Sequence, residues 1–124
     1  MIRVLLVDDD LNLSEALKEG LTDRGFDVMN SYSGNDAIGI IGAGEFDVVV
    51  TDLYMSNGGG QQLIDWCRKN KPELKLLAVS GELLDSFVTA LDVVEDNGIP
   101  TMEKPFTASQ LGDVINGMMN NNFY

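Results

Sequence analysis

Three acidic residues and one lysine stand at the ends of strand-like segments in this sequence. Asp8 and Asp9 come directly after one aliphatic run, Asp52 comes after a second, and Lys104 follows a third segment near the end of the chain. Clustered carboxylates bind hard divalent cations, and an ammonium beside them can pair with an anion. The residue types therefore indicate a hard-cation site with an anion-binding partner, an arrangement that favours phosphoryl chemistry.

These residues can meet only if their strands are parallel neighbours. Runs of about four aliphatic residues without polar alternation are typical of strands that helices cover on both faces. In such sheets, ligands bind beyond the carboxyl ends of the strands. The predicted strands are 2–7, 26–31, 47–52, 75–79 and 99–103, and the predicted helices are 13–24, 34–43, 60–70, 84–97 and 107–119.

Strict alternation of strands and helices with short connections predicts an α/β fold. Five such units are too few for a (β/α)8 barrel, and they favour an open, doubly wound sheet with right-handed crossovers. We expect a (βα)5 flavodoxin-like three-layer sandwich whose parallel sheet has the strand order 2-1-3-4-5. This order places the first and third strands side by side and so brings Asp8, Asp9 and Asp52 together. Residues 1–124 are expected to form one domain.

Three helices carry recognisable end signals. Gly25 follows the first predicted helix and can adopt the left-handed conformation that ends a helix. Ser33 and Asp36 have the spacing of a capping box at the start of the second. Thr107 and Gln110 have the same spacing at the start of the last helix, where the signal is clearest.

Composition restricts the function. The formal net charge of −12 argues against nucleic acid or an anionic membrane as a direct partner. No apolar stretch reaches the length of a membrane span, and we expect a cytoplasmic protein. The single cysteine, Cys67, excludes an internal disulfide and has the spacing of a buried helix position. A group of basic residues is expected to be a solvated helix end and strand start: Arg68, Lys69, Lys71 and Lys75.

The acidic cluster suits Mg²⁺. This ion prefers octahedral oxygen ligands and usually takes only one or two carboxylates. Asp9 and Asp52 match this demand, with Asp8 acting through a water molecule. Because three carboxylates repel one another, at least one of their pKa values should rise. Lys104 can neutralise phosphoryl oxygens during transfer to Asp52, and Ser80, which follows the fourth strand, offers a hydroxyl on the same rim.

A series of motifs along the whole chain resembles that of bacterial two-component response regulator receiver domains, and in particular of stand-alone, chemotaxis-regulator-like ones. The motifs are Asp8-Asp9, Asp52-Leu53-Tyr54-Met55, Gly60, Ser80-Gly81 and Lys104-Pro105-Phe106. The resemblance implies a phosphorelay module that accepts a phosphoryl group on Asp52 from a sensor histidine kinase or phosphotransfer protein. It implies Mg²⁺ ligation by Asp9, Asp52 and the Tyr54 carbonyl, with Asp8 through water. Ser80 and Lys104 would contact phosphoryl oxygens.

The resemblance also implies a binding switch with only weak self-catalysed phosphoryl transfer and hydrolysis, and not a conventional enzyme. The chain ends without an effector domain, so we expect output through protein contacts of the fourth helix, fifth strand and fifth helix. Two positions depart from the family pattern. Ser56 stands where receivers usually carry proline, and Thr101 replaces the usual switch aromatic.

Two alternative interpretations remain open from the sequence. A degenerate receiver would serve as a constitutive interaction module and would never be phosphorylated. A haloacid-dehalogenase-like phosphatase would use Asp8 as its nucleophile in an Asp8-x-Asp10 motif, with Ser80 and Lys104 in support. Trapping the phosphoryl group on Asp8 or on Asp52 distinguishes the phosphatase from the receiver.

Overall fold

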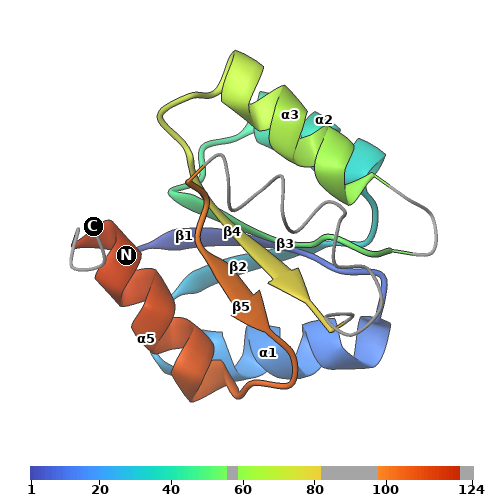
Figure 1. Cartoon of the computed structure of the whole chain (residues 1–124). Helices are drawn as coiled ribbons and strands as arrows, with labels where there is room; N and C mark the ends of the chain where they lie inside the picture. Colours follow the sequence, from blue (N-terminus) through green and yellow to red (C-terminus); the bar gives the residue numbers. More distant parts are fainter. Residues whose placement is uncertain (56–58, 82–97, 121–124) are drawn as a thin grey trace.

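A computed structural model describes residues 1–55, 59–81 and 98–120. Within these ranges, five parallel strands form one sheet in the order β2-β1-β3-β4-β5, as the sequence predicted (Figure 1). The strands are β1 (Arg3–Val7), β2 (Asp27–Ser31), β3 (Val48–Asp52), β4 (Lys75–Ser80) and β5 (Thr101–Glu103). The helices are α1 (Leu11–Asp23), α2 (Gly34–Ala43), α3 (Gly60–Asn70) and α5 (Ala108–Met119). The helix predicted over 84–97 lies outside the described residues.

The helices cover both faces of the sheet in two layers. Helices α2 and α3 lie on one face, and α1 and α5 lie on the other, which gives the predicted three-layer sandwich (Figure 1). Along β1, Leu5 and Val7 belong to the core under α2 and α3, whereas Val4 and Leu6 belong to the core under α1 and α5. Burial of both faces explains why the strand sequences show no polar alternation.

Two boundaries of the described elements differ from the prediction by two residues, and the others agree to within one residue. Helix α1 begins at Leu11, two residues early, because the Asp10 side chain accepts a hydrogen bond from the Leu13 N–H and so caps the helix. Strand β5 begins at Thr101 and not at residue 99. Pro100 has no N–H to donate to a neighbouring strand, although its carbonyl accepts a hydrogen bond from the Ala78 N–H at 3.0 Å.

The helix-end signals are confirmed, with one difference. Thr107 and Gln110 form a complete capping box on α5, and Gly25 adopts φ +92° after α1. The Ser33 hydroxyl accepts a hydrogen bond from the Asp36 N–H. The Asp36 carboxylate, however, accepts a hydrogen bond from the buried Ser31 hydroxyl at 2.9 Å, which ties the start of α2 to the end of β2.

The described helices are all too short or too polar to cross a membrane.

Candidate functional site

The sheet register brings the three predicted aspartates to one place. Val7 pairs with Thr51 across β1 and β3, so Asp8 and Asp52 follow at the same level of the sheet. Each of Asp8, Asp9 and Asp52 offers a carboxylate oxygen, and these oxygens all lie within 4.8 Å of one another. Asp8 and Asp52 are buried, and Asp9 is half-buried. The convergence predicted from the sequence is therefore confirmed.

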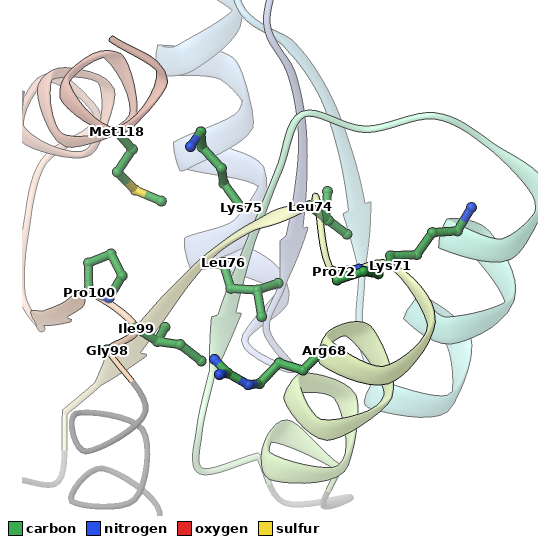
Figure 2. A pocket seen from close by; sticks show the side chains of 10 residues that line it. All are labelled: Arg68, Lys71, Pro72, Leu74, Lys75, Leu76, Gly98, Ile99, Pro100 and Met118. Carbon is green, nitrogen blue, oxygen red and sulfur yellow. The ribbon is translucent and has the colours of Figure 1, made fainter. Parts of the chain in front are cut away.

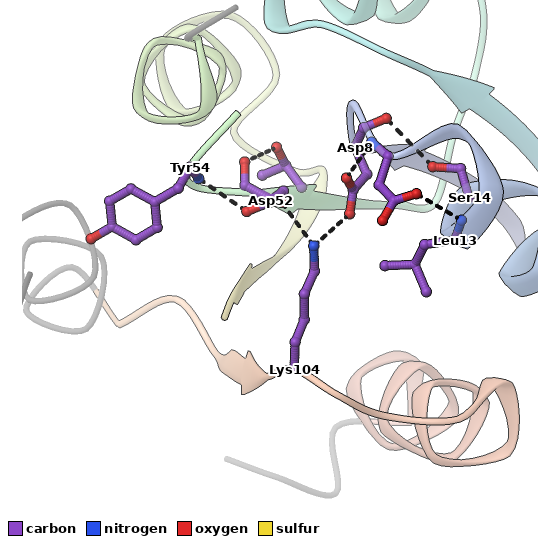
Figure 3. Close-up of polar contacts among 8 residues, drawn as sticks. Asp8, Leu13, Ser14, Asp52, Tyr54 and Lys104 are labelled. Carbon is purple, nitrogen blue, oxygen red and sulfur yellow. Dashed lines mark hydrogen bonds and ion pairs between the residues drawn. The ribbon is translucent and has the colours of Figure 1, made fainter. Parts of the chain in front are cut away.

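Lys104 lies between two of these carboxylates, as Figure 3 shows. Its Nζ donates to Asp8 Oδ2 and to Asp52 Oδ2, at 2.9 Å in each case. The Lys104 N–H donates to the Ser80 carbonyl at 2.9 Å, which holds the end of β5 against the end of β4. Gly81 passes beside the lysine stem, because a Cβ added there would lie 3.6 Å from Lys104 Cβ. The ammonium therefore reaches the aspartates from a position that backbone contacts define.

The second oxygen of each buried carboxylate is held by a backbone N–H. Asp52 Oδ1 accepts from the Tyr54 N–H at 3.0 Å, and Asp8 Oδ1 accepts from the Asp10 N–H at 2.9 Å (Figure 3). The Ser14 hydroxyl donates to the Asp8 carbonyl at 3.4 Å. These contacts orient the carboxylates before any ligand arrives. The sequence analysis did not predict these hydrogen bonds, because each depends on the backbone conformation just after a strand.

Two pKa values in the cluster shift. Burial raises the pKa of the Asp52 carboxyl, and hydrogen bonds from Lys104 and from the Tyr54 N–H oppose this rise. The predicted increase is thus confirmed, but its main cause is burial, and repulsion by Asp8 is the smallest contribution. Burial alone would lower the pKa of Lys104, but hydrogen bonds to Asp8 and Asp52 and the attraction of their negative charges together outweigh burial and raise it. Lys104 therefore stays charged at neutral pH.

The other predicted site residues lie around this cluster. Ser80 ends β4 one residue beyond Val79, which pairs with Asp52, and it is fully buried. Tyr54 is half-buried on the turn after β3. Thr101 is half-buried at the start of β5, where it pairs with Ala78. Asp10 is exposed and caps α1, so its carboxylate has a structural use away from the cluster.

The donor set fits Mg²⁺. All the candidate ligand atoms are carboxylate or carbonyl oxygens, which are the ligands that hard divalent cations prefer. One ammonium compensates three carboxylates only in part, so a divalent cation would remove the excess negative charge. A set of cysteine and histidine ligands, which would favour zinc, is not present in this cluster.

The predicted group of basic residues, from Arg68 to Lys75, lies at the other end of the sheet. A cavity of about 340 Å³ there is lined by Arg68, Lys71, Pro72, Leu74, Lys75, Leu76, Gly98, Ile99, Pro100 and Met118 (Figure 2). Lys75 begins β4, so this cavity lies at the amino ends of the strands, away from the aspartates. Arg68 and Lys69 are exposed in the last turn of α3, where positive charge stabilises a helix. The expected solvated helix end is thus confirmed, whereas Lys71 and Lys75, at the expected strand start, are half-buried.

Comparison with known proteins points to one family. The family model of the response regulator receiver domain matches residues 4–116. The sensor kinase CckA of Brucella abortus (strain 2308) is 33% identical over 118 residues, which are 94% of this chain and 12% of that protein. The DNA-binding transcriptional regulator NtrC of Rhizobium meliloti (strain 1021) is 30% identical over 112 residues, which are 90% of this chain and 23% of that protein. The chain thus spans less than a quarter of these two relatives.

Solved structures share the fold at lower identity. A CheY-like response regulator receiver domain protein from Methanospirillum hungatei JF-1 superposes with a TM-score of 0.88 at 20% identity, covering 98% of this chain and 95% of that one. The response regulator TrrA of Thermotoga maritima, solved in complex with Mg²⁺-BeF, gives a TM-score of 0.79 at 24% identity and covers 94% and 97%. Together with the match of the family model over residues 4–116, these likenesses show that the chain belongs to the response regulator receiver domain family.

Proposed function

We propose that Asp52 is the residue of this receiver that accepts the phosphoryl group. Receiver domains of two-component systems take phosphoryl groups from histidine kinases. In the proposed step, a carboxylate oxygen of Asp52 forms a bond to phosphorus while the bond from phosphorus to the donor's histidine nitrogen breaks. The observation that carries the proposal is the position of the Asp52 carboxylate, within 4.8 Å of Asp8 and Asp9 oxygens and 2.9 Å from the Lys104 ammonium.

The same geometry supports a Mg²⁺ site. We assign Asp9, Asp52 and the Tyr54 carbonyl as direct ligands, with Asp8 acting through water. Bound Mg²⁺ supplies positive charge at the phosphoryl oxygens. Asp8 and Asp52 are already oriented by the N–H groups of Asp10 and Tyr54, so the carboxylates need little rearrangement to bind the ion. TrrA, which has the same fold, was solved with Mg²⁺-BeF bound.

Lys104 and Ser80 are proposed to recognise the phosphoryl group. The Lys104 ammonium sits 2.9 Å from Asp52 and can exchange a carboxylate oxygen for a phosphoryl oxygen with a small movement. Ser80 ends the neighbouring strand and is fully buried, so its hydroxyl has to become accessible when the phosphoryl group is present. Backbone contact between Ser80 and Lys104 joins the two, because the Lys104 N–H donates to the Ser80 carbonyl.

The whole chain, residues 1–124, is proposed to be one receiver domain that switches protein contacts, with no more than weak self-catalysed transfer and hydrolysis. The donor is a sensor histidine kinase or phosphotransfer protein. The surface that contacts a downstream protein is assigned to the fourth helix, β5 and α5. Of this surface, the structure describes β5 and α5. Lys104 directly follows β5. If its ammonium moves onto a phosphoryl group, the end of β5 should therefore move with it and change this surface.

The assignment of Asp52 is tested with a small phosphodonor. The protein is incubated with acetyl phosphate and Mg²⁺, and the modified residue is mapped by mass spectrometry. Wild type should carry the acyl phosphate on Asp52, and Asp52→Asn should carry none, because an amide is not the required nucleophile. Asp65→Asn, at an exposed position of α3, is the matched control and should react as wild type does. A phosphoryl group on another residue of Asp52→Asn would refute the assignment.

The same experiment addresses both alternatives. A degenerate receiver would form no acyl phosphate under any condition. A haloacid-dehalogenase-like phosphatase would carry the phosphoryl group on Asp8. The match to the receiver family removes the support for the phosphatase, and Asp10, the second acid of its motif, serves as the cap of α1.

The output surface is tested by hydrogen exchange with and without beryllofluoride, a phosphoryl mimic. New protection is expected in the segments that follow Ser80 and precede Lys104, because these two residues make the differential contacts. Protection that is confined to residues 53–60 would contradict the assignment of the output surface.

A further inference from the structure

The first turn of α2 contacts two residues that adjoin the acidic site, Ser31 and Gly59, although none of its own residues is a candidate ligand. Just before this turn, the carbonyl of Ser31 accepts a hydrogen bond from the Asp8 N–H at 3.1 Å. The Ser31 hydroxyl in turn donates to Asp36 in α2 at 2.9 Å. The start of α2 is therefore joined to the strand end that carries Asp8.

On its other side, the same turn meets the segment that follows Asp52. A Cβ placed on Gly34 would lie 2.5 Å from the carbonyl oxygen of Gly59 and 2.9 Å from its Cα. The contact is reciprocal, since a Cβ on Gly59 would lie 3.1 Å from Gly34 Cα. The two glycines therefore allow direct contact between their backbones. Position 59 also favours glycine because its φ is +98°.

The contact continues from Gly59 to the nucleophile. A Cβ on Gly60 would lie 2.6 Å from the Asp52 carbonyl oxygen and 2.8 Å from that of Leu53. The Gly59 carbonyl also accepts the first hydrogen bond of α3, from the Leu63 N–H at 2.8 Å. A displacement of Gly59 would therefore move the start of α3, and with it the backbone that packs on the turn after Asp52.

We propose that Gly34 is a positioning residue for the Mg²⁺ and phosphoryl site. Because Gly34 has no side chain, the backbone of α2 packs directly on Gly59. This contact holds Gly60 against the Asp52–Leu53 backbone. The position of that backbone in turn orients the Asp52 carboxylate and the Tyr54 carbonyl. Because the neighbour at 2.5 Å is a backbone atom and not the end of a flexible side chain, any side chain at Gly34 must displace this segment relative to α2. The inference rests on the Mg²⁺ site of the proposed function.

The test compares Gly34→Ala with Gly39→Ala. Both glycines lie in α2 and both substitutions add the same methyl group, but a Cβ at Gly39 would meet nothing within 4 Å. Mg²⁺ affinity is measured by titration calorimetry at a temperature where melting curves show that both variants are folded. We expect Gly34→Ala to raise the Mg²⁺ dissociation constant at least about tenfold, as loss of outer-shell support typically does. Gly39→Ala should stay within about twofold of wild type.

A purely structural role would give another result. Gly34→Ala would then melt at a lower temperature yet, while folded, bind Mg²⁺ as tightly as Gly39→Ala does, and this outcome would overturn the inference. The rate of acyl-phosphate formation at saturating Mg²⁺ is a second readout, and Gly34→Ala should lower it. If wild type neither binds Mg²⁺ nor forms an acyl phosphate, the proposed function fails, and the inference fails with it.

A measurement on wild type covers the case in which Gly34→Ala does not fold. Backbone amide resonances are followed by NMR during titration with MgCl₂. The Gly34 and Gly59 signals should shift with the same midpoint as calorimetry gives, whereas Gly39 and Gly42, which have open space around them, should not. An unchanged Gly34 signal at saturating Mg²⁺ would contradict the inference.

Discussion

Lys104 shows how one side chain can stabilise a site that its neighbours destabilise. It bridges Asp8 and Asp52, and the side chains of all three are at most 22% exposed. Removing one partner of a buried ion pair usually destabilises a protein by several kcal/mol because the remaining charge has no counter-charge. Here two carboxylates would lose that counter-charge together, so the metal-free site depends on this lysine.

We therefore predict that Lys104→Met lowers the free energy of unfolding by about 1–3 kcal/mol without metal, less than for a fully buried pair because the site is partly open. Mg²⁺ should reduce this loss, because it supplies the missing positive charge. Urea unfolding with EDTA and with millimolar MgCl₂ measures both values. Lys18→Met, at an exposed position of α1, is the control and should change little. A loss that is equal with and without Mg²⁺ would argue against a metal at this site.

Asp9 should behave in the opposite way. Three carboxylates are held within 4.8 Å in the fold, and their repulsion is largely relaxed in the unfolded chain. Removal of one charge at a partly exposed position should be worth on the order of 1 kcal/mol. We predict that Asp9→Ala melts at a higher temperature than wild type without metal and loses most of the gain from Mg²⁺. A variant that melts lower in EDTA, or that keeps the full gain, would show that Asp9 is a structural residue.

Cys67 is a buried thiol with a shifted titration. It lies in α3 with none of its surface exposed, and burial raises the pKa of the thiol to about 11. We predict no reaction with a thiol reagent at pH 8 until urea unfolds the chain. Because the folded pKa exceeds the unfolded one, unfolding releases a proton between about pH 9 and pH 11, and stability falls across this window. The stability difference between wild type and Cys67→Ala should therefore shrink from pH 9 to pH 11, which urea titrations would reveal.

At the scale of the elements, the caps determine where helices begin and so where the site residues stand. The capping box of α5 lies three residues after Lys104, with the Thr107 hydroxyl accepting from the Gln110 N–H at 3.1 Å and the Gln110 side chain accepting from the Thr107 N–H at 2.8 Å. The cap thus determines where the short connection between β5 and α5, which contains Lys104, ends.

Loss of this cap should destabilise the fold without changing the chemistry of the site. We predict that Thr107→Ala lowers the free energy of unfolding by about 1 kcal/mol. Thr22→Ala is the control, because Thr22 is exposed inside α1 and alanine is the better helix former there. Urea unfolding compares the two variants, and equal effects would mean that the Thr107 hydroxyl contributes nothing as a cap.

At the scale of the whole molecule, charge is the dominant feature. A net charge of −12 on 124 residues produces self-repulsion that the compact fold feels more strongly than the unfolded chain. We predict that KCl raises the melting temperature of the metal-free protein by a few degrees between about 10 mM and 0.5 M, since salt screens these charges over a few ångströms. Asp9→Ala should gain about as much from KCl as wild type, which separates general screening from Mg²⁺ binding. A flat response to KCl would contradict this account.

The strands, the topology and the acidic residues at the strand ends could all be predicted from the amino-acid sequence. Aliphatic runs without alternation reveal strands because burial on both faces allows few polar residues, and the alternation of strands and helices allows few topologies. Caps such as Thr107 could be predicted because their hydrogen-bond partners lie only three residues away in the sequence. The convergence of Asp8, Asp9 and Asp52 followed from the strand order alone.

How these residues interact could be seen only in the three-dimensional structure. It showed that Lys104 is shared between Asp8 and Asp52. It also showed that Gly34 meets Gly59. Each of these contacts depends on positions to within a few tenths of an ångström, and long-range contacts also depend on the registers of several strands and helices at once. The sequence shows the spacing of apolar residues in an element and where the element ends. The distance between two atoms from different elements results from packing of the whole molecule.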